Sequence, residues 1–224
     1  MATIFRTWSQ QYPWLHSSIS WLAALNIGGV ARFRRIALEG LEIQPEMQVL
    51  DLCCGSGQTT QILVMQSAHV TGLDAAAAAL AQAAQAAPAA KYIQGWAESM
   101  PFDDDQFDLV HVSMALHEMR PVQLWRVLQE AHRVLKPGGV LAFVDFHLPS
   151  NWLYRLSLDL FLGLFETEAV WQFIKTDLLD LLVRVGFQQA ECRLYASGSL
   201  QVGQAQKESQ NRLNSEFRGL NSEA

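Results

Sequence analysis

Short apolar segments alternate with helical patterns through the middle of the chain. Five segments have the apolar or β-branched composition of strands in a covered sheet: residues 47–53, 68–74, 91–95, 107–113 and 140–147. Three intervening segments have helical composition or spacing: residues 58–66, 75–87 and 121–135. Strands that alternate with helices in this way predict an α/β fold built on a mostly parallel sheet.

The pattern changes after the fifth strand. Two helices and then two strands are predicted there, in the order 151–165, 176–185, 187–196 and 199–207. The two strands are joined near Ser197-Gly198, which is typical of an antiparallel hairpin. The expected fold is therefore Rossmann-like and doubly wound, with a seven-stranded, mostly parallel sheet and an antiparallel closing hairpin.

The chain divides into three expected parts. Residues 1–40 predict an N-terminal helical cap, residues 41–206 the main α/β domain, and residues 207–224 a disordered polar tail. Within the main domain, residues at about 149–175 predict an insertion that covers the substrate. The cap contains a basic cluster formed by Arg32, Arg34 and Arg35. This cluster is either a solvated helix face or a docking surface for an acidic or polar ligand end.

Charge and cysteine content narrow the functional classes. The 224 residues carry a formal net charge of −6, which argues against a broad nucleic-acid surface, because phosphate contacts need clustered Lys and Arg. The odd count of three cysteines indicates a reducing compartment. The N-terminus has no signal-peptide pattern, and the longest apolar region, 152–165, is too short and too interrupted to span a bilayer. We therefore expect a cytoplasmic protein. No His or Cys spacing suggests a metal site.

The segment VLDLCCGSGQTT at 49–60 is the main chemical feature of the sequence. It predicts a strand ending near Asp51, a turn through Gly55 and Gly57, and the start of a helix. A dinucleotide loop would have a third glycine where Thr60 stands, and a Walker loop would contain a lysine. An acid with two glycines and no lysine suits a ligand that carries an ammonium and a sulfonium, which is S-adenosylmethionine.

A second acid ends the next strand. Asp74 lies 19 residues beyond Gly55, close to the spacing at which a carboxylate meets a ribose diol in βαβ units. Asp is also a good N-cap for the helix that follows. Asp74 is therefore predicted to bind ribose, to cap a helix, or to do both.

Three blocks of sequence resemble the class I S-adenosylmethionine-dependent methyltransferases. They are VLDLCCGSGQTT, GWAESMPFDDDQFDLVHVSMALHEM and RVLKPGGVLAFVDF, and together they span residues 47–147. Within this class the chain looks most like the ubiquinone/menaquinone biosynthesis C-methyltransferases. The finer resemblance is carried by CCGSG, by the upstream SIS…GGVARFRR segment and by the closing GF…SGSLQV hairpin.

The resemblance implies roles for residues at matching positions. Asp51, Gly55 and Gly57 would hold the methionine part of the cofactor, and Asp74 would bind the ribose hydroxyls. Residues implied for the remaining parts are Ala97 and Glu98 at the adenine, Ser113 and Met114 beneath the sulfonium, and Tyr12 over the methionine carboxylate. The chain departs from its relatives at Trp96, where they commonly have an Asp that accepts from the adenine amino group.

Methyl transfer needs mainly proximity and orientation, since the sulfonium is already activated. A base is required only if the acceptor must lose a proton. His117, just past the fourth strand, and His147, at the end of the fifth, are the candidates for this role, although either can also be a packed structural histidine.

The aromatic and aliphatic segments at both ends of the domain predict the substrate class. They favour a small, lipophilic aromatic acceptor, quinol-like or phenol-like, and they imply transient contact with a membrane surface. Ser113-Met114-Ala115-Leu116 replaces the Pro-Pro-aromatic of nucleic-acid amino-methyltransferases, so a nucleic-acid substrate is disfavoured. No obligate protein partner is expected. The alternative hypothesis is a module that binds S-adenosylmethionine for regulation or scaffolding without turnover.

Overall fold

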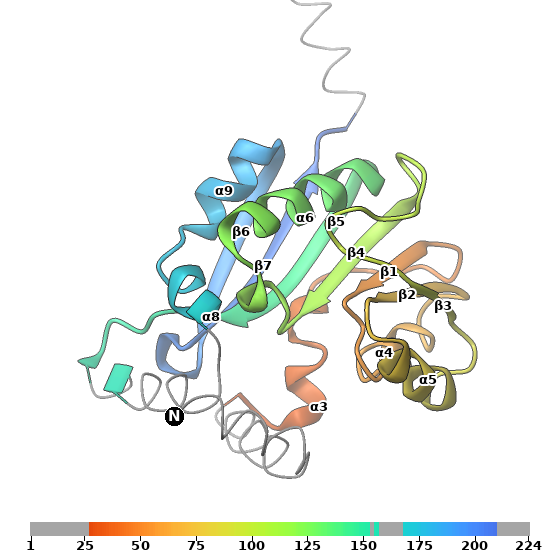
Figure 1. Cartoon of the computed structure of the whole chain (residues 1–224), viewed down its shortest axis with the longest axis horizontal. Helices are drawn as coiled ribbons and strands as arrows, with labels where there is room; N and C mark the ends of the chain where they lie inside the picture. The colour runs from red at the N-terminus through yellow and green to blue at the C-terminus, as the bar shows by residue number, and fades with distance from the viewer. Residues whose placement is uncertain (1–26, 153–154, 157–167, 210–224) are drawn as a thin grey trace, which may run out of the picture.

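One seven-stranded sheet organises the protein in the computed structural model, which describes residues 27–152, 155–156 and 168–209 (Figure 1). The strand order is β3-β2-β1-β4-β5-β7-β6. The strands are β1 Gln48–Leu52, β2 His69–Asp74, β3 Lys91–Gln94, β4 Phe107–Ser113, β5 Leu135–Phe146, β6 Phe187–Tyr195 and β7 Leu200–Lys207. β1 to β5 pair in parallel, whereas β7 runs antiparallel to both β5 and β6. The predicted fold class is confirmed.

Helices cover both faces of this sheet. The α-helices are α3 Val30–Phe33, α4 Thr60–Leu63, α5 Ala77–Ala86, α6 Pro121–Val134, α8 Glu168–Phe173 and α9 Leu178–Val185. Short 3₁₀ helices are η1 Ile36–Leu38, η2 Leu116–Glu118 and η3 Ala196–Gly198. Figure 1 shows α6 and α9 on the opposite side of the sheet from α4 and α5. Crossover helices on alternate faces are the mark of a doubly wound fold.

The central strands are apolar on both faces. In β1, Leu50 and Leu52 pack into the larger apolar cluster with α6, α8 and α9, while Val49 packs into the smaller cluster with η1 and α4. All three side chains are fully or almost fully buried. A parallel strand covered on both faces needs such a continuous apolar run, which is why the pattern was visible in the sequence.

Two local predictions were wrong in their bounds. The strand expected over 140–147 begins earlier, because β5 starts at Leu135 and includes Pro137-Gly138-Gly139, where its register shifts against β4. The helix expected over 58–66 shortens to α4, because the turn of the Gly loop continues up to its N-cap, Thr59. In the described part of the cap expected over 1–40, α3 and η1 are two short helices, and the apolar run of η1 is buried beneath β5 and β7.

Several predicted segments lie outside the described residues. They include residues 1–26 of the expected N-terminal cap, with Tyr12, and residues 210–224 of the expected tail. Most of the helix expected over 151–165 and part of the covering insertion also fall outside, at 153–154 and 157–167. Within the described residues, no helix is long and apolar enough to cross a membrane.

Candidate cofactor site

A cavity of about 810 Å³ opens at the carboxyl ends of β1, β2 and β4. Its volume lies within the usual range for small-molecule sites, and this end of the strands is where open α/β sheets bind ligands. Seven residues with a predicted cofactor role line its wall: Asp51, Gly55, Asp74, Ala97, Glu98, Ser113 and Met114. They come from separate segments between residues 51 and 114, and they meet because parallel strands end at one edge of the sheet.

The Gly loop is shaped by left-handed backbone conformations. Cys53, Gly55 and Gly57 have φ values of +55°, +52° and +78°. A Cβ on Gly55 would meet no heavy atom within 4 Å, so the backbone faces open space at the cavity. A Cβ on Gly57 would come within 2.9 Å of Ala83 in α5. Gly57 is not among the lining residues and serves the close packing of the loop against α5.

Asp51 is held in a buried hydrogen-bonded group beneath the loop. Thr60 Oγ1 donates to Asp51 Oδ2 at 2.6 Å, and His111 Nδ1 lies 3.0 Å from Asp51 Oδ1. All three residues are buried, and His111 is the register partner of Asp51 across the β1–β4 pair. The two contacts fix both carboxylate oxygens and so fix the orientation of Asp51. The roles of His111 and Thr60 were not predicted from the sequence; the single polar residue in the apolar run 109–112 was the available signal.

Asp74 connects β2 to the Gly loop. Its Oδ2 accepts from the Gly55 amide at 2.9 Å, and its Oδ1 accepts from the Ala76 amide at 2.8 Å. The N-cap of α5 is Ala76, so Asp74 lies two residues before the cap position and organises the turn that leads to it. The carboxylate also lines the cavity, where the ribose role remains a prediction.

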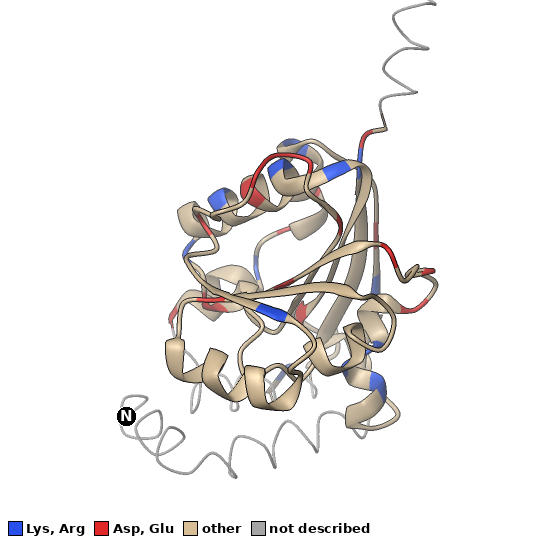
Figure 2. Ribbon diagram, turned by 90° about the vertical axis from the view of Figure 1, so that its right-hand side faces the viewer, with Lys and Arg blue, Asp and Glu red and all other residues tan. Residues whose placement is uncertain are grey.

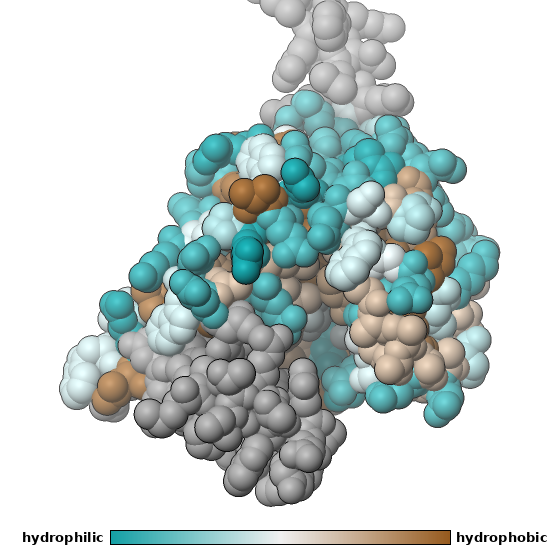
Figure 3. All heavy atoms as spheres, in the orientation of Figure 1, coloured by the Kyte–Doolittle hydropathy of each residue, from teal (hydrophilic) through white to brown (hydrophobic). Residues whose placement is uncertain are grey.

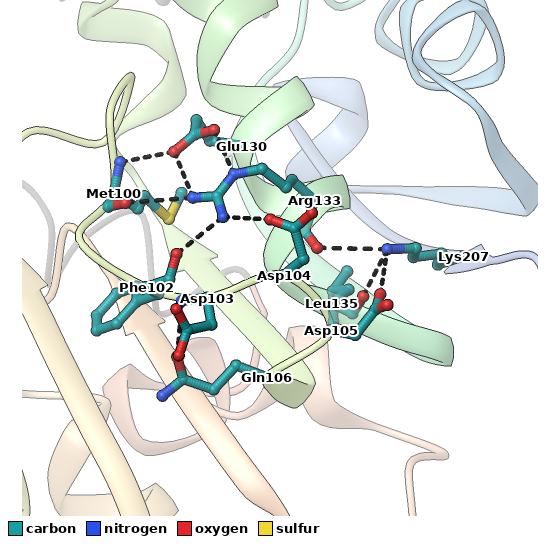
Figure 4. A network of polar contacts seen from close by, with 10 residues as sticks. All are labelled: Met100, Phe102, Asp103, Asp104, Asp105, Gln106, Glu130, Arg133, Leu135 and Lys207. Atoms are coloured by element: carbon teal, nitrogen blue, oxygen red, sulfur yellow. Dashed lines mark hydrogen bonds and ion pairs between the residues drawn. The ribbon is translucent and has the colours of Figure 1, made fainter.

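The loop after β3 forms the wall predicted to lie at the adenine. Trp96 lines the cavity with 65% of its surface exposed, Ala97 is buried, and Glu98 accepts from Gln123 Nε2 at 3.0 Å. The continuation of this loop is fastened to α6 by Arg133 (Figure 4). The Arg133 guanidinium donates to the carbonyls of Met100 and Phe102 and to the carboxylates of Glu130 and Asp104.

The Arg133 group also shifts pKa values. The hydrogen bond from Arg133 is the main cause that lowers the pKa of Glu130, and the same contact raises the pKa of Arg133. Glu130 Oε2 in turn accepts from the Met100 amide at 2.7 Å. Both groups are therefore charged near neutral pH, and the ion pair holds the loop from both sides.

The segment after β4 forms the wall predicted to lie at the sulfonium. Ser113, Met114, Ala115 and Glu118 line the cavity, and Met114 has the left-handed φ of +52°. This left-handed conformation turns the chain sharply at the point where the strand meets the cavity. Strained backbone of this kind in non-glycine residues is concentrated at functional sites.

The two candidate catalytic histidines do not line the cavity. His117 is buried, with Nδ1 2.6 Å from Asp145 Oδ1 and its ring 4.7 Å from that of Phe146. Asp145 Oδ2 also accepts from the amides of Leu116 and His117, so this pair organises η2. His147 directly follows the last residue of β5, and its Nδ1 donates to the Gly198 carbonyl at 2.8 Å. The role of Asp145 was not predicted from the sequence.

Two cysteines of the Gly loop also line the cavity. Burial is the main cause that raises the pKa of the Cys53 thiol to about 12, and burial likewise raises the pKa of Cys54. Both are therefore neutral thiols near pH 7 and act as small apolar side chains. Within the described residues, no group of three or more His, Cys, Asp or Glu could hold a metal ion.

Comparisons with known proteins identify the family. The methyltransferase domain family matches residues 49–139. A protein of Synechocystis sp. named as an uncharacterized methyltransferase is 56% identical over 205 residues, covering 92% of this chain and 97% of the relative. The chain belongs to the class I S-adenosylmethionine-dependent methyltransferases. Its cofactor is S-adenosylmethionine.

Further relatives of this methyltransferase place it near the quinone enzymes. A 2-phytyl-1,4-naphtoquinone methyltransferase of Nostoc punctiforme is 33% identical over 150 residues, covering 63% of this chain and 64% of the relative. Among solved structures, an S-adenosylmethionine-dependent methyltransferase of Thermotoga maritima aligns with a TM-score of 0.64 at 18% identity, covering 91% of this chain and all of that one (100%). The structural likeness supports the fold, and the sequence likeness supports the enzyme class.

Proposed function

We propose that this methyltransferase transfers the methyl group of S-adenosylmethionine to a small, lipophilic aromatic acceptor of the quinol or phenol type. The observation that carries the acceptor class is the similarity to the naphthoquinone methyltransferase of Nostoc punctiforme. Apolar side chains on the cavity wall support it: Val30, Phe33, Met114, Ala115 and Met119. A flat apolar ring needs such a wall, and a charged acceptor would not.

We further propose the cofactor contacts that the predicted residues make. Asp51 and the loop at Gly55 and Gly57 hold the methionine part, with Gly57 acting through the packing of the loop. Asp74 binds the ribose hydroxyls, and Ala97 and Glu98 bound the adenine. Ser113 and Met114 support the sulfonium. Tyr12, outside the described residues, closes over the methionine end.

The reaction is an in-line displacement. An electron pair of the acceptor carbon or oxygen forms the new bond to the methyl carbon, and the S–C bond breaks with its electrons remaining on sulfur. The product is neutral at sulfur, S-adenosylhomocysteine, and a proton leaves the acceptor. The enzyme's contribution is to align the two reactants and exclude water.

A base takes up the proton that leaves the acceptor. His117 and His147 are the proposed groups, and either would have to reach the cavity through a rearrangement on substrate binding, because neither lines it. Glu118 lines the cavity beside His117 and offers a carboxylate without such a movement. Comparing pH profiles of methyl transfer for His117→Asn, His147→Gln and Glu118→Gln separates the three, since only removal of the true base abolishes the profile's acid limb.

Contact with a membrane surface follows from the lipophilic acceptor. Trp152 and Leu156, four residues apart, are 73% and 62% exposed, which supports such a contact. Figure 3 shows a largely hydrophilic surface with separate hydrophobic spots on the described part of that face, and Figure 2 shows basic and acidic residues interspersed along the described ribbon. Neither pattern favours a nucleic-acid partner.

The test is incubation of the purified protein with methyl-labelled S-adenosylmethionine and a panel of acceptors. The panel contains anaerobically reduced demethylated quinols, simple phenols and a lipid extract. We expect label in a quinol or phenol product that extracts into organic solvent. Tight cofactor binding with no labelled product from any acceptor would refute the acceptor class and favour a binding module without turnover.

A further inference from the structure

The charged side chains on the cavity wall are unequal in sign. Of those in the described part of the chain, four are acidic and one is basic: Asp51, Asp74, Glu98, Glu118 and Arg34. The aminoacyl end of S-adenosylmethionine carries an ammonium and a carboxylate. The acidic groups attract the ammonium and the sulfonium, but they repel the carboxylate. A carboxylate buried against such a wall needs a cation.

Among the residues that the structure describes, Arg34 is the one side chain on this wall that can supply that cation. It lies at the C-terminal end of α3 and is half-buried. Within the described residues, its guanidinium makes no hydrogen bond or ion pair. A half-buried guanidinium with five donors and no partner has its hydrogen-bonding capacity available to a ligand.

The neighbouring arginines of the basic cluster are occupied elsewhere. Arg32 Nε lies 3.1 Å from Glu39 Oε1, and Arg35 Nε donates to the Ala31 carbonyl at 3.1 Å. Arg32 and Arg35 line a separate surface depression with Glu39. Arg32 and Arg35 therefore share one environment, and of these three arginines only Arg34 lines the cofactor cavity.

α3 brings Arg34 to the cavity that Asp51 and the Gly loop also line. Phe33, its neighbour, lines the same cavity and packs against both apolar clusters, which holds this segment to the body of the domain. Gly28 and Gly29, with φ values of +93° and +95°, turn the chain into α3. Figure 1 shows α3 beyond the tip of β4.

We propose that Arg34 binds the carboxylate of the methionine part of S-adenosylmethionine. The planar guanidinium pairs with a carboxylate through two parallel N–H···O bonds. This inference rests on the proposed placement of the methionine part at Asp51 and the Gly loop. It resolves the alternative left by the basic cluster: Arg34 meets an acidic ligand end, while Arg32 and Arg35 form the outer surface.

A ligand that lacks only the carboxylate tests this contact. Calorimetry with S-adenosylmethionine and with decarboxylated S-adenosylmethionine is compared for the wild-type protein, Arg34→Met and the matched control Arg35→Met. We expect Arg34→Met to weaken S-adenosylmethionine binding by about 10- to 100-fold, the usual value of a hydrogen bond to a charged group. Binding of the decarboxylated ligand should change less than about twofold, and Arg35→Met should bind both ligands as the wild type does.

Two results would overturn the assignment. Arg34→Met could bind S-adenosylmethionine as tightly as the wild type, or it could lose both ligands equally, which would indicate a structural role. If Arg34→Met does not fold, Arg34→Lys takes its place: it keeps the charge but loses the two parallel N–H···O bonds, so it should weaken S-adenosylmethionine binding and leave the decarboxylated ligand unchanged, and unchanged binding of both ligands would overturn the assignment. A wild type that binds neither ligand would refute the cofactor site itself, and that outcome is distinct from a failure of Arg34 alone.

Discussion

Arg133 gives the sharpest prediction about how the site is maintained. Substituting Arg133→Met keeps most of the apolar stem but removes all the guanidinium donors that fasten the loop after β3 to α6 (Figure 4). The bond to the exposed Asp104 contributes little, about 0.5 kcal/mol. The bonds to the two backbone carbonyls and to the partly buried Glu130 contribute about 1 kcal/mol each. We expect the free energy of unfolding to fall by about 2 to 4 kcal/mol.

Urea unfolding followed by circular dichroism measures the change in the free energy of unfolding, and a thermal melt measures the change in Tm. Because a domain of this length shifts its Tm by about 2 to 4 °C per kcal/mol, the melting temperature should fall by roughly 4 to 16 °C. Binding of S-adenosylhomocysteine should also weaken, because the same loop carries Ala97 and Glu98 on the cavity wall. Arg126→Met, exposed on the same helix, is the matched control and should change the free energy of unfolding by less than about 0.5 kcal/mol. A loss below 1 kcal/mol for Arg133→Met would refute the idea that this guanidinium holds the loop.

The remaining predictions concern packing, pH and thiol reactivity. Gly57→Ala should cost about 2 kcal/mol or more and weaken cofactor binding, since its Cβ would lie 2.9 Å from Ala83; Gly40→Ala, with a similar φ of +85° but nothing within 4 Å, should cost only the backbone strain of about 1 kcal/mol. The pKa of Glu130 is lowered, so its contribution is complete above the usual Glu pKa of about 4.3 and is lost as pH falls through the folded value. The difference in stability between the wild type and Arg133→Met should therefore narrow in thermal melts below about pH 4. A difference that stays constant with pH would contradict this. Cys53, with its pKa raised to about 12, should react with a thiol reagent at pH 7.5 more slowly than free cysteine, as measured by absorbance, and rapid labelling would show that the thiol is not shielded.

Local sequence patterns were sufficient for the fold and for much of the cavity wall. Continuous apolar runs mark strands covered on both faces, and an acid followed by two glycines marks a turn at which a backbone can approach a ligand. Asp51 and Met114 are far apart in sequence, yet their shared cavity was predictable. Both follow or end parallel strands, and those strands must end at the same edge of the sheet.

Which polar groups pair with one another could not be read from the same patterns. His111 meets Asp51 because β1 and β4 pair in a particular register, and a shift by one residue would separate them. His117 was a candidate for catalysis by its position after β4, but in the fold it turns to Asp145 from the neighbouring strand. The sequence shows titratable residues, whereas their partners depend on strand order, register and side-chain direction.

The division between local and tertiary information therefore follows the range of the interactions. Periodicity and turn chemistry act over a few residues, so the chain alone specifies its strands, its Gly loop and the edge where a methyl donor binds. Selection of Arg34 from three nearby arginines, and the packing of Gly57 against α5, depend on contacts between elements distant in sequence. Those contacts exist only after the sheet has assembled, because only then do burial and spacing give each side chain its environment.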